Sequence, residues 1–277
     1  MNKIHRLIPV VFILLLIFGF QSRSSAQSVW VDQDESESVV GIELLIPSLS
    51  DVYSTDFPTS ALVLYGRFWA GDNVRIDVDL PISHVSVSEG DLSETDIGNP
   101  YVGAGFMNAE NGVSFDIGVR LPLAPNFNIS NPNDNLGLFT GFLVENYNVG
   151  KYAPETFSIT SQVKYRWQNP SGLIVKVGGG PDVIFPPDDA DAEFYLNYHS
   201  QLLYGTENFR IGAGFTGLLI VTESDRSFGE RTIHELGIIS GYDFGPMDAG
   251  AYLRIPLDDE ISSDVDFVLG LNFLFSL

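Results

Sequence analysis

Apolar and polar residues alternate one by one along much of this chain. The clearest run is VSFDIGVRL at 113–121, in which every odd-numbered residue is apolar and the intervening residues are polar or glycine. A period of two predicts a β-strand with two unlike faces. The same pattern predicts twelve strands, at about 39–47, 58–69, 72–83, 96–107, 112–122, 155–168, 172–184, 191–204, 207–221, 231–245, 247–256 and 264–277.

The last predicted strand sets the fold class. Its apolar face runs through alternate positions from Phe267 to Leu277, the final residue, while Asp266, Gly270, Asn272 and Ser276 lie on its other face. A strand of this kind fits a wall with lipid on one side and a polar interior on the other. We therefore predict an all-β protein, a transmembrane antiparallel up-and-down β-barrel of about twelve strands.

The connections between strands support this topology. Hairpin-length turns at 71–72, 108–112, 169–172, 205–208 and 245–246 alternate with longer links at 48–57, 84–95, 122–154, 186–190, 222–230 and 258–263. Outer-membrane barrels have short periplasmic turns, long extracellular loops and an even number of strands. On this topology a girdle of aromatic residues lies at the periplasmic ends, on the lipid side: Phe68, Phe106, Phe115, Tyr165, Trp167, Phe209, Tyr242, Phe244, Phe273 and Phe275.

The longest predicted loop contains a helical pattern. Apolar residues of segment 135–148 recur at helical spacing from Leu136 to Tyr147, and Asp134 is a suitable N-cap. We expect a short helix in the longest extracellular loop. The pattern leaves open whether the helix folds into the barrel mouth or lies on its rim.

The N-terminus carries an export signal. Lys3 and Arg6 precede an apolar run from Leu7 to Phe20, and Ala26 follows small residues, as in a cleaved signal peptide. The run is too short for a membrane-spanning helix. We expect a signal peptide at 1–26, an acidic periplasmic tail at 27–38 and the barrel at 39–277. We expect the protein to lie in the Gram-negative outer membrane. Its expected partners are the lipids of that membrane and the barrel-assembly machinery, which would bind the C-terminal strand.

Composition narrows the range of possible functions. The formal net charge is −22, and the leader contains basic residues but no acidic ones, so the mature chain is more acidic still. Such a charge argues against nucleic-acid binding. Cysteine is absent, which excludes disulfides and thiolate chemistry. The acidic loops are explained by solubility, a saline habitat or cation binding, and the sequence does not decide among these.

Alternation also assigns residues to the interior. The inward charged residues predicted to line the lumen are Arg67, Arg75, Asp77, Asp79, Asp116, Arg120, Lys164, Arg166, Lys176, Asp182, Glu193, Arg210, Glu235, Asp243 and Arg254. They either brace the wall as ion pairs or bias the contents of a pore. Many glycines also point inward. They either leave open volume or make room for large side chains such as Tyr195 and Tyr252, and we expect a serine at Gly118 to be mild.

No catalytic constellation is visible. His199 and Ser200 lie on opposite faces of one strand, and no hydrolase, zinc-protease or phosphate-loop motif occurs. We therefore expect no enzyme, no catalytic residue, no cofactor and no metal site.

Two neighbouring segments carry a family resemblance. The stretch Asp96–Ala104, DIGNPYVGA, followed by Phe115–Pro122, FDIGVRLP, resembles the outer-membrane barrels of the MetA-pathway-of-phenol-degradation family. The resemblance implies transport of small, hydrophobic or aromatic compounds and carries over no catalytic residue. The sequence thus favours a narrow channel or facilitator for small molecules. The alternative is a non-transporting envelope barrel whose acidic loops bind surface partners or cations.

Overall fold

The structure is a computed structural model of the full chain. It describes residue 30 and residues 37–49, 59–87, 92–108, 112–126, 136–187, 190–223 and 227–277. The predicted leader, most of the predicted tail and the proposed N-cap Asp134 lie outside these residues.

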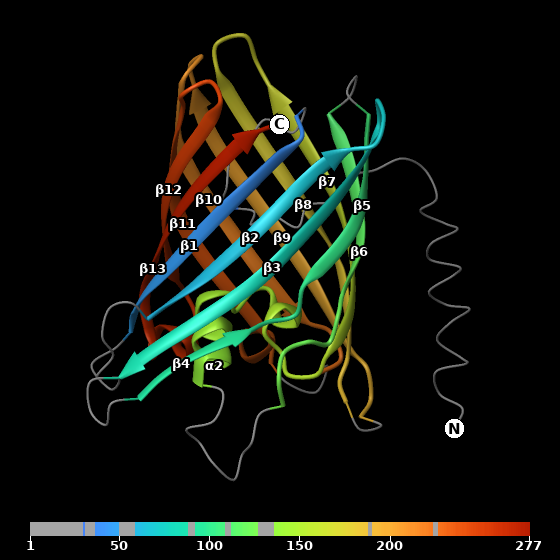
Figure 1. The fold of residues 1–277 in the computed structure, drawn as a ribbon, viewed down its shortest axis with the longest axis vertical. Coiled ribbons are helices and arrows are strands. Elements are labelled where there is room, and N and C mark those ends of the chain that lie inside the picture. The colour runs from blue at the N-terminus through green and yellow to red at the C-terminus, as the bar shows by residue number, and fades with distance from the viewer. Residues whose placement is uncertain are drawn as a thin grey trace.

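The described chain consists mainly of antiparallel strands that form one closed barrel (Figure 1). The strands are β1 Val39–Leu49, β2 Ser60–Trp69, β3 Val74–Val87, β4 Leu92–Ile97, β5 Tyr101–Asn108, β6 Val113–Arg120, β7 Phe157–Gln168, β8 Leu173–Phe185, β9 Glu193–Gly205, β10 Phe209–Ile220, β11 Thr232–Asp243, β12 Met247–Pro256 and β13 Val265–Ser276. The helices are α2 Leu136–Val144 and α3 Asp259–Ser262, with 3-10 turns η1 Val149–Lys151 and η2 Gly229–Arg231.

The hydrogen-bonded ladder closes on itself. Strand β1 pairs with β13 on one side and with β2 on the other, and the additional pairing of β2 with β3 completes the ring. Because β4 and β5 pair with successive parts of β3, they occupy one position in the wall. The barrel is therefore twelve-stranded, as predicted. Closure gives the strands of the ring a partner on both sides, which a wall in lipid requires, whereas β4 pairs with β3 alone.

One predicted strand is divided in two. The segment predicted as a single strand at 96–107 is broken between β4 and β5 at Gly98–Pro100, and β3 and β4 extend into the link predicted at 84–95. Pro100 has no N–H to donate to the ladder. An ideal Cβ at Gly98 would lie 2.6 Å from the Lys151 carbonyl oxygen, so the chain approaches another segment closely at this break.

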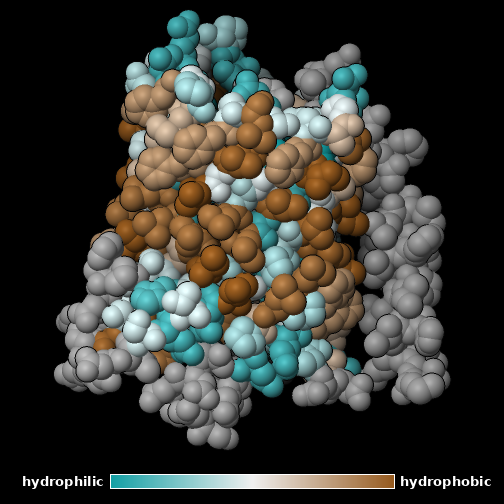
Figure 2. Space-filling model, in the orientation of Figure 1, coloured by the Kyte–Doolittle hydropathy of each residue, from teal (hydrophilic) through white to brown (hydrophobic). Residues whose placement is uncertain are grey.

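The outer surface has the apolar belt that lipid requires. On the face shown in Figure 2, hydrophobic residues cover the middle of the barrel and hydrophilic residues gather at its two ends. Phe68, Trp167, Tyr242 and Phe273 of the predicted girdle are among the exposed large hydrophobic residues, and each lies toward the last residues of its strand. Among the described residues, no helix is long and apolar enough to cross a membrane.

Large side chains occupy the space that the inward glycines leave. An ideal Cβ at Gly270 would lie 2.0 Å from Tyr252 Cζ, and one at Gly118 would lie 2.2 Å from the Tyr101 hydroxyl. At these positions the inward glycines therefore make room for large side chains rather than leave open volume. The expectation that a serine at Gly118 would be mild is wrong, because the Tyr101 ring already fills that space.

The position of a residue within the apolar belt should determine how much an outward-facing charged side chain destabilises the barrel. Ile117 lies on the outer face near the middle of β6, and Val113 lies on the same face at the first residue of that strand. We expect Ile117→Arg to lower the free energy of unfolding by about 2–4 kcal/mol and Val113→Arg by about 0–1 kcal/mol, because charge is costliest at the midplane of the bilayer. Urea unfolding in lipid vesicles measures both values, and equal costs would contradict the assignment of the belt.

Candidate functional site

A segment of the longest loop lies inside the barrel. We call residues 136–152 the plug; it contains α2 and η1 and enters the mouth at the end opposite the C-terminus (Figure 1). Its buried residues Leu138, Leu143 and Val144 belong to the same apolar cluster as the inward wall residues Leu45 and Val268. The helix predicted at 135–148 therefore exists and folds into the mouth rather than lying on the rim.

The first turn of the plug helix is held by two wall carboxylates. The backbone N–H of Leu136 donates to Glu94 Oε2 at 2.7 Å, and that of Leu138 donates to Asp96 Oδ2 at 3.2 Å. The first N–H groups of a helix have no partner within the helix, and negative charge is favourable at that end. Strand β4 thus supplies the capping groups that α2 needs.

Asn99 joins the wall to the far end of the plug. Its side-chain amide donates to the carbonyl oxygens of Gly150 at 3.0 Å and Ala153 at 2.6 Å, while its Oδ1 accepts from the N–H groups of Leu123 at 3.0 Å and Ala124 at 2.9 Å. These bonds satisfy both the donors and the acceptor of the amide. The interruption between β4 and β5 places Asn99 where it can make them.

Arg120 and Asp79 brace the same region. The two Arg120 Nη atoms donate to the two Asp79 carboxylate oxygens, each at 2.9 Å, and Nη1 also donates to the Asn99 carbonyl oxygen at 2.8 Å. Bidentate pairs of this kind fix geometry as well as charge. The sequence placed both residues inward, and the structure shows them as a pair between β3 and β6.

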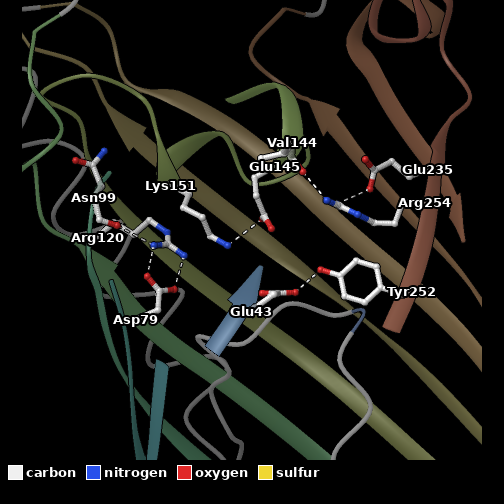
Figure 3. A network of polar contacts seen from close by, with 10 residues as sticks. All are labelled: Glu43, Asp79, Asn99, Arg120, Val144, Glu145, Lys151, Glu235, Tyr252 and Arg254. Atoms are coloured by element: carbon white, nitrogen blue, oxygen red, sulfur yellow. Dashed lines mark hydrogen bonds and ion pairs between the residues drawn. The ribbon is translucent and has the colours of Figure 1, made fainter. Parts of the chain in front are cut away.

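A second group of polar side chains lies where the plug meets the opposite wall (Figure 3). Lys151 Nζ lies 2.9 Å from Glu145 Oε2 within the plug. On the wall, Arg254 Nη1 lies 3.0 Å from Glu235 Oε2, and its Nη2 donates to the Val144 carbonyl oxygen. The Tyr252 hydroxyl donates to Glu43.

The charges in this group are almost fully buried. Glu43, Glu145, Lys151, Glu235 and Arg254 are each at most 1% exposed. Burial disfavours the charged form of Glu145, but Lys151 and Arg254 beside it outweigh this and hold the pKa of its carboxyl below the usual value. Removing one partner of a buried ion pair is strongly destabilising, because the other charge stays buried and unpaired.

The half of the barrel nearer the C-terminus also contains ion pairs. Asp77 lies 2.8 Å from Arg75 Nε and 3.3 Å from Arg67 Nε. Further pairs there include Lys164 with Asp116 at 2.7 Å and Arg210 with Asp248 at 3.1 Å.

The predicted interior residues divide into two groups. Those almost fully buried inside the barrel are Arg67, Arg75, Asp77, Asp79, Asp116, Arg120, Asp182, Glu235 and Arg254. Those more open to solvent are Lys164, Arg166, Lys176, Glu193, Arg210 and Asp243. Asp182 bonds to Thr160 and Asn197 in the wall, and it is not part of the group in Figure 3.

Several residues of the site are not among those predicted from the sequence. Glu43 is at an inward position of a predicted strand and alternation could have found it, whereas Asn99, Glu145 and Lys151 lie in irregular segments where alternation gives no signal. Trp30, in the predicted tail, also packs inside the barrel. Its ring stacks on Tyr252 with centroids 6.3 Å apart.

A histidine outside the bore also has partners that the sequence did not indicate. His234 Nε2 lies 2.7 Å from the Tyr198 hydroxyl, and its Nδ1 lies 3.3 Å from Asp258 Oδ1. Phe215 stacks on the imidazole with centroids 5.5 Å apart. Among the residues that the structure places, no group of three or more His, Cys, Asp or Glu side chains is arranged to hold a metal ion.

No family model matches the chain, and no curated protein matches it in sequence. Similar solved structures include LpxR from Salmonella typhimurium, with 10% identity and a TM-score of 0.48 over 86% of this chain and 100% of that one. The KdgM porin has 8% identity and a TM-score of 0.46 over 86% and 99%. The CymD monoaromatic hydrocarbon channel has 10% identity and a TM-score of 0.45 over 88% and 90%. Similarity at this level identifies neither a family nor a function.

Asn99 offers a direct test of how the plug is held. We expect Asn99→Leu to loosen the plug, because each lost hydrogen bond contributes about 0.5–1.5 kcal/mol and the buried groups left without partners cost more. Limited proteolysis should then cut within 136–152 faster than in the wild type. Asn208→Leu, at an exposed position in a turn, is the matched control. Equal cleavage of the two variants would show that Asn99 does not hold the plug.

Low pH should weaken the plug through Glu145. Because the folded-state pKa of this carboxyl is lowered from 4.5, its contribution is fully present above that pH and is lost as the pH falls through the folded value. We expect proteolysis of the plug to accelerate on acidification in the wild type. In Glu145→Gln the plug should already be loosened at neutral pH and respond less to acid. An identical response in both proteins would contradict the role of Glu145.

Proposed function

We propose that this protein is an outer-membrane channel for small solutes whose closed state is held by the plug. The main observation behind the proposal is that the plug is part of a loop and not of the barrel wall. The mouth is filled by a loop that is separate from the wall and held to it through side chains such as Asn99 and Arg254. A segment attached in this way can leave the bore without breaking the barrel.

Several further features support a place in the outer membrane. The apolar belt suits a bilayer, the leader suits export with cleavage after Ala26, and the C-terminal strand suits recognition by the barrel-assembly machinery. Once the plug moves, the inward charged residues would line the path. The resemblance carried by 96–122 adds hydrophobic or aromatic compounds as first candidates for the solute.

A second candidate is a structural envelope barrel with acidic, surface-binding loops. The ion pairs favour it, since Asp77 and Asp79 with their arginine partners brace the wall whether or not solute passes. The two functions differ in what happens when the plug is removed. Only a channel gains conductance.

Removal of the plug tests the proposal. Deleting Asp134–Asn148 should raise single-channel conductance and small-solute uptake in proteoliposomes, because the segment that fills the mouth is gone. Deleting Ser227–Glu230 from another loop at the same end is the control and should leave both unchanged. A plug-deleted barrel that inserts but remains electrically silent would favour the structural barrel.

A reversible lock makes the test sharper. An ideal Cβ at Gly137 would lie 3.2 Å from Asp96 Cγ, the atom that a cysteine sulfur would replace, so two cysteines at these positions are close enough to form a disulfide. The chain has no cysteine of its own, so Asp96→Cys with Gly137→Cys adds the only pair. We expect the oxidised variant to stay closed and the reduced variant to conduct. Conductance that does not respond to reductant would contradict gating by the plug.

A further inference from the structure

The charges where the plug meets the wall do not balance. Three carboxylates, Glu43, Glu145 and Glu235, share this region with two cations, Lys151 and Arg254, all at most 1% exposed. Fully ionised, the group would carry one surplus negative charge out of contact with solvent. Such a charge is strongly unfavourable, and buried groups in this situation take up a proton or a partner.

Two of these carboxylates face each other across the contact. Figure 3 shows Glu145 extending from the plug toward Glu43 on β1, and the two charges repel each other. Glu145 Oε2 is bound to Lys151 at 2.9 Å, and Glu43 Oε1 accepts from Tyr252. The other oxygens, Glu43 Oε2 and Glu145 Oε1, are buried and accept no hydrogen bond from any group that the structure describes.

We propose that Glu43 carries a proton that it shares with Glu145, so that a carboxylic acid–carboxylate pair links the wall to the plug. A single proton accounts for both observations. It removes the surplus negative charge, and it supplies a donor where Glu43 Oε2 and Glu145 Oε1 have none. The pair is therefore a proton-binding site at the point where the plug is held.

The surroundings assign the proton to Glu43. Lys151 binds Glu145 directly, and Arg254 lies near it as a second cation, so Glu145 is the member kept ionised. Glu43 has a phenol as its nearest partner. The titratable and charged groups that face the pair are Lys151, Tyr147 and Tyr152 from the plug, Tyr252 and Arg254 from β12, Glu235 from β11, Tyr65 from β2 and Arg120 from β6.

The pair makes the hold on the plug depend on pH. When the pH rises far enough to remove the shared proton, two carboxylates face each other and the plug is held less tightly. One proton is linked to opening, so the ratio of open to closed plug should rise by up to about tenfold per pH unit above this transition. The consequence for conduction rests on the proposed function, whereas the proton itself does not.

Infrared spectroscopy of the intact barrel detects the proton directly. At neutral pH we expect the C=O stretch of a protonated carboxylic acid, and we expect it to disappear as the pH is raised. The band should be lost in Glu43→Gln and kept in Glu207→Gln, a control at an exposed turn position. A wild-type spectrum without the band at neutral pH, or a band that survives in Glu43→Gln, would overturn the proposal.

Proteolysis of the plug across the alkaline range gives a second measurement that needs no conduction. The wild type should show the increase with pH, and both Glu43→Gln and Glu145→Gln should lack it, because either change removes the pair. Protection that depends on the concentration of sodium or calcium ions, without an acid band, would show that a cation rather than a proton joins the carboxylates, and would overturn the proposal. A silent channel that retains the band and the pH response would refute the proposed function alone.

Discussion

The pairing of buried charge inside the bore is the constraint on which the rest of this structure depends. The apolar belt leaves no place for charge on the outer wall, and the closed ladder fixes which residues point inward. Arg120 must therefore find Asp79, and Arg254 must find Glu235. The wall alone does not satisfy every group, since Arg254 also donates to the Val144 carbonyl oxygen of the plug. Barrel and plug thus satisfy part of each other's hydrogen bonding.

The interruption at Gly98–Pro100 follows from the same constraint. A continuous strand here would add backbone hydrogen bonds to the sheet. The strand geometry would then fix the direction of the Asn99 side chain. In the observed structure Asn99 instead binds backbone groups on both sides of the longest loop. Some ladder bonds are lost, and specific contacts to the plug are gained. The break is therefore one of the points at which the wall holds the plug.

Much of the barrel could be predicted because alternation records the face of each residue. The strands, the inward charges and the aromatic girdle follow from that period. The break at Asn99 was not predicted, although the alternation changes phase there: the exposed apolar residue before the break, Ile97, is odd-numbered, whereas Val102 and Phe106 beyond it are even-numbered. The position of the helix was also open, because burial in a mouth and packing on a rim require the same apolar stripe. Glu145 and Lys151 lie outside the strands, so no face could be assigned to them.

The polar character of the contact between plug and wall bears on what it can do. An apolar contact of the same size loses its whole hydrophobic contribution when water enters, whereas hydrogen bonds are largely exchanged for bonds to water at a net cost of about 0.5–1.5 kcal/mol each. A contact built on Asn99, Asp96 and Arg254 is thus specific in geometry but modest in net strength once hydrated. This combination suits a segment that must seat in one place and still leave. A permanent filling would be better served by extending the apolar cluster around Leu138 and Val144, which the plug does only in part.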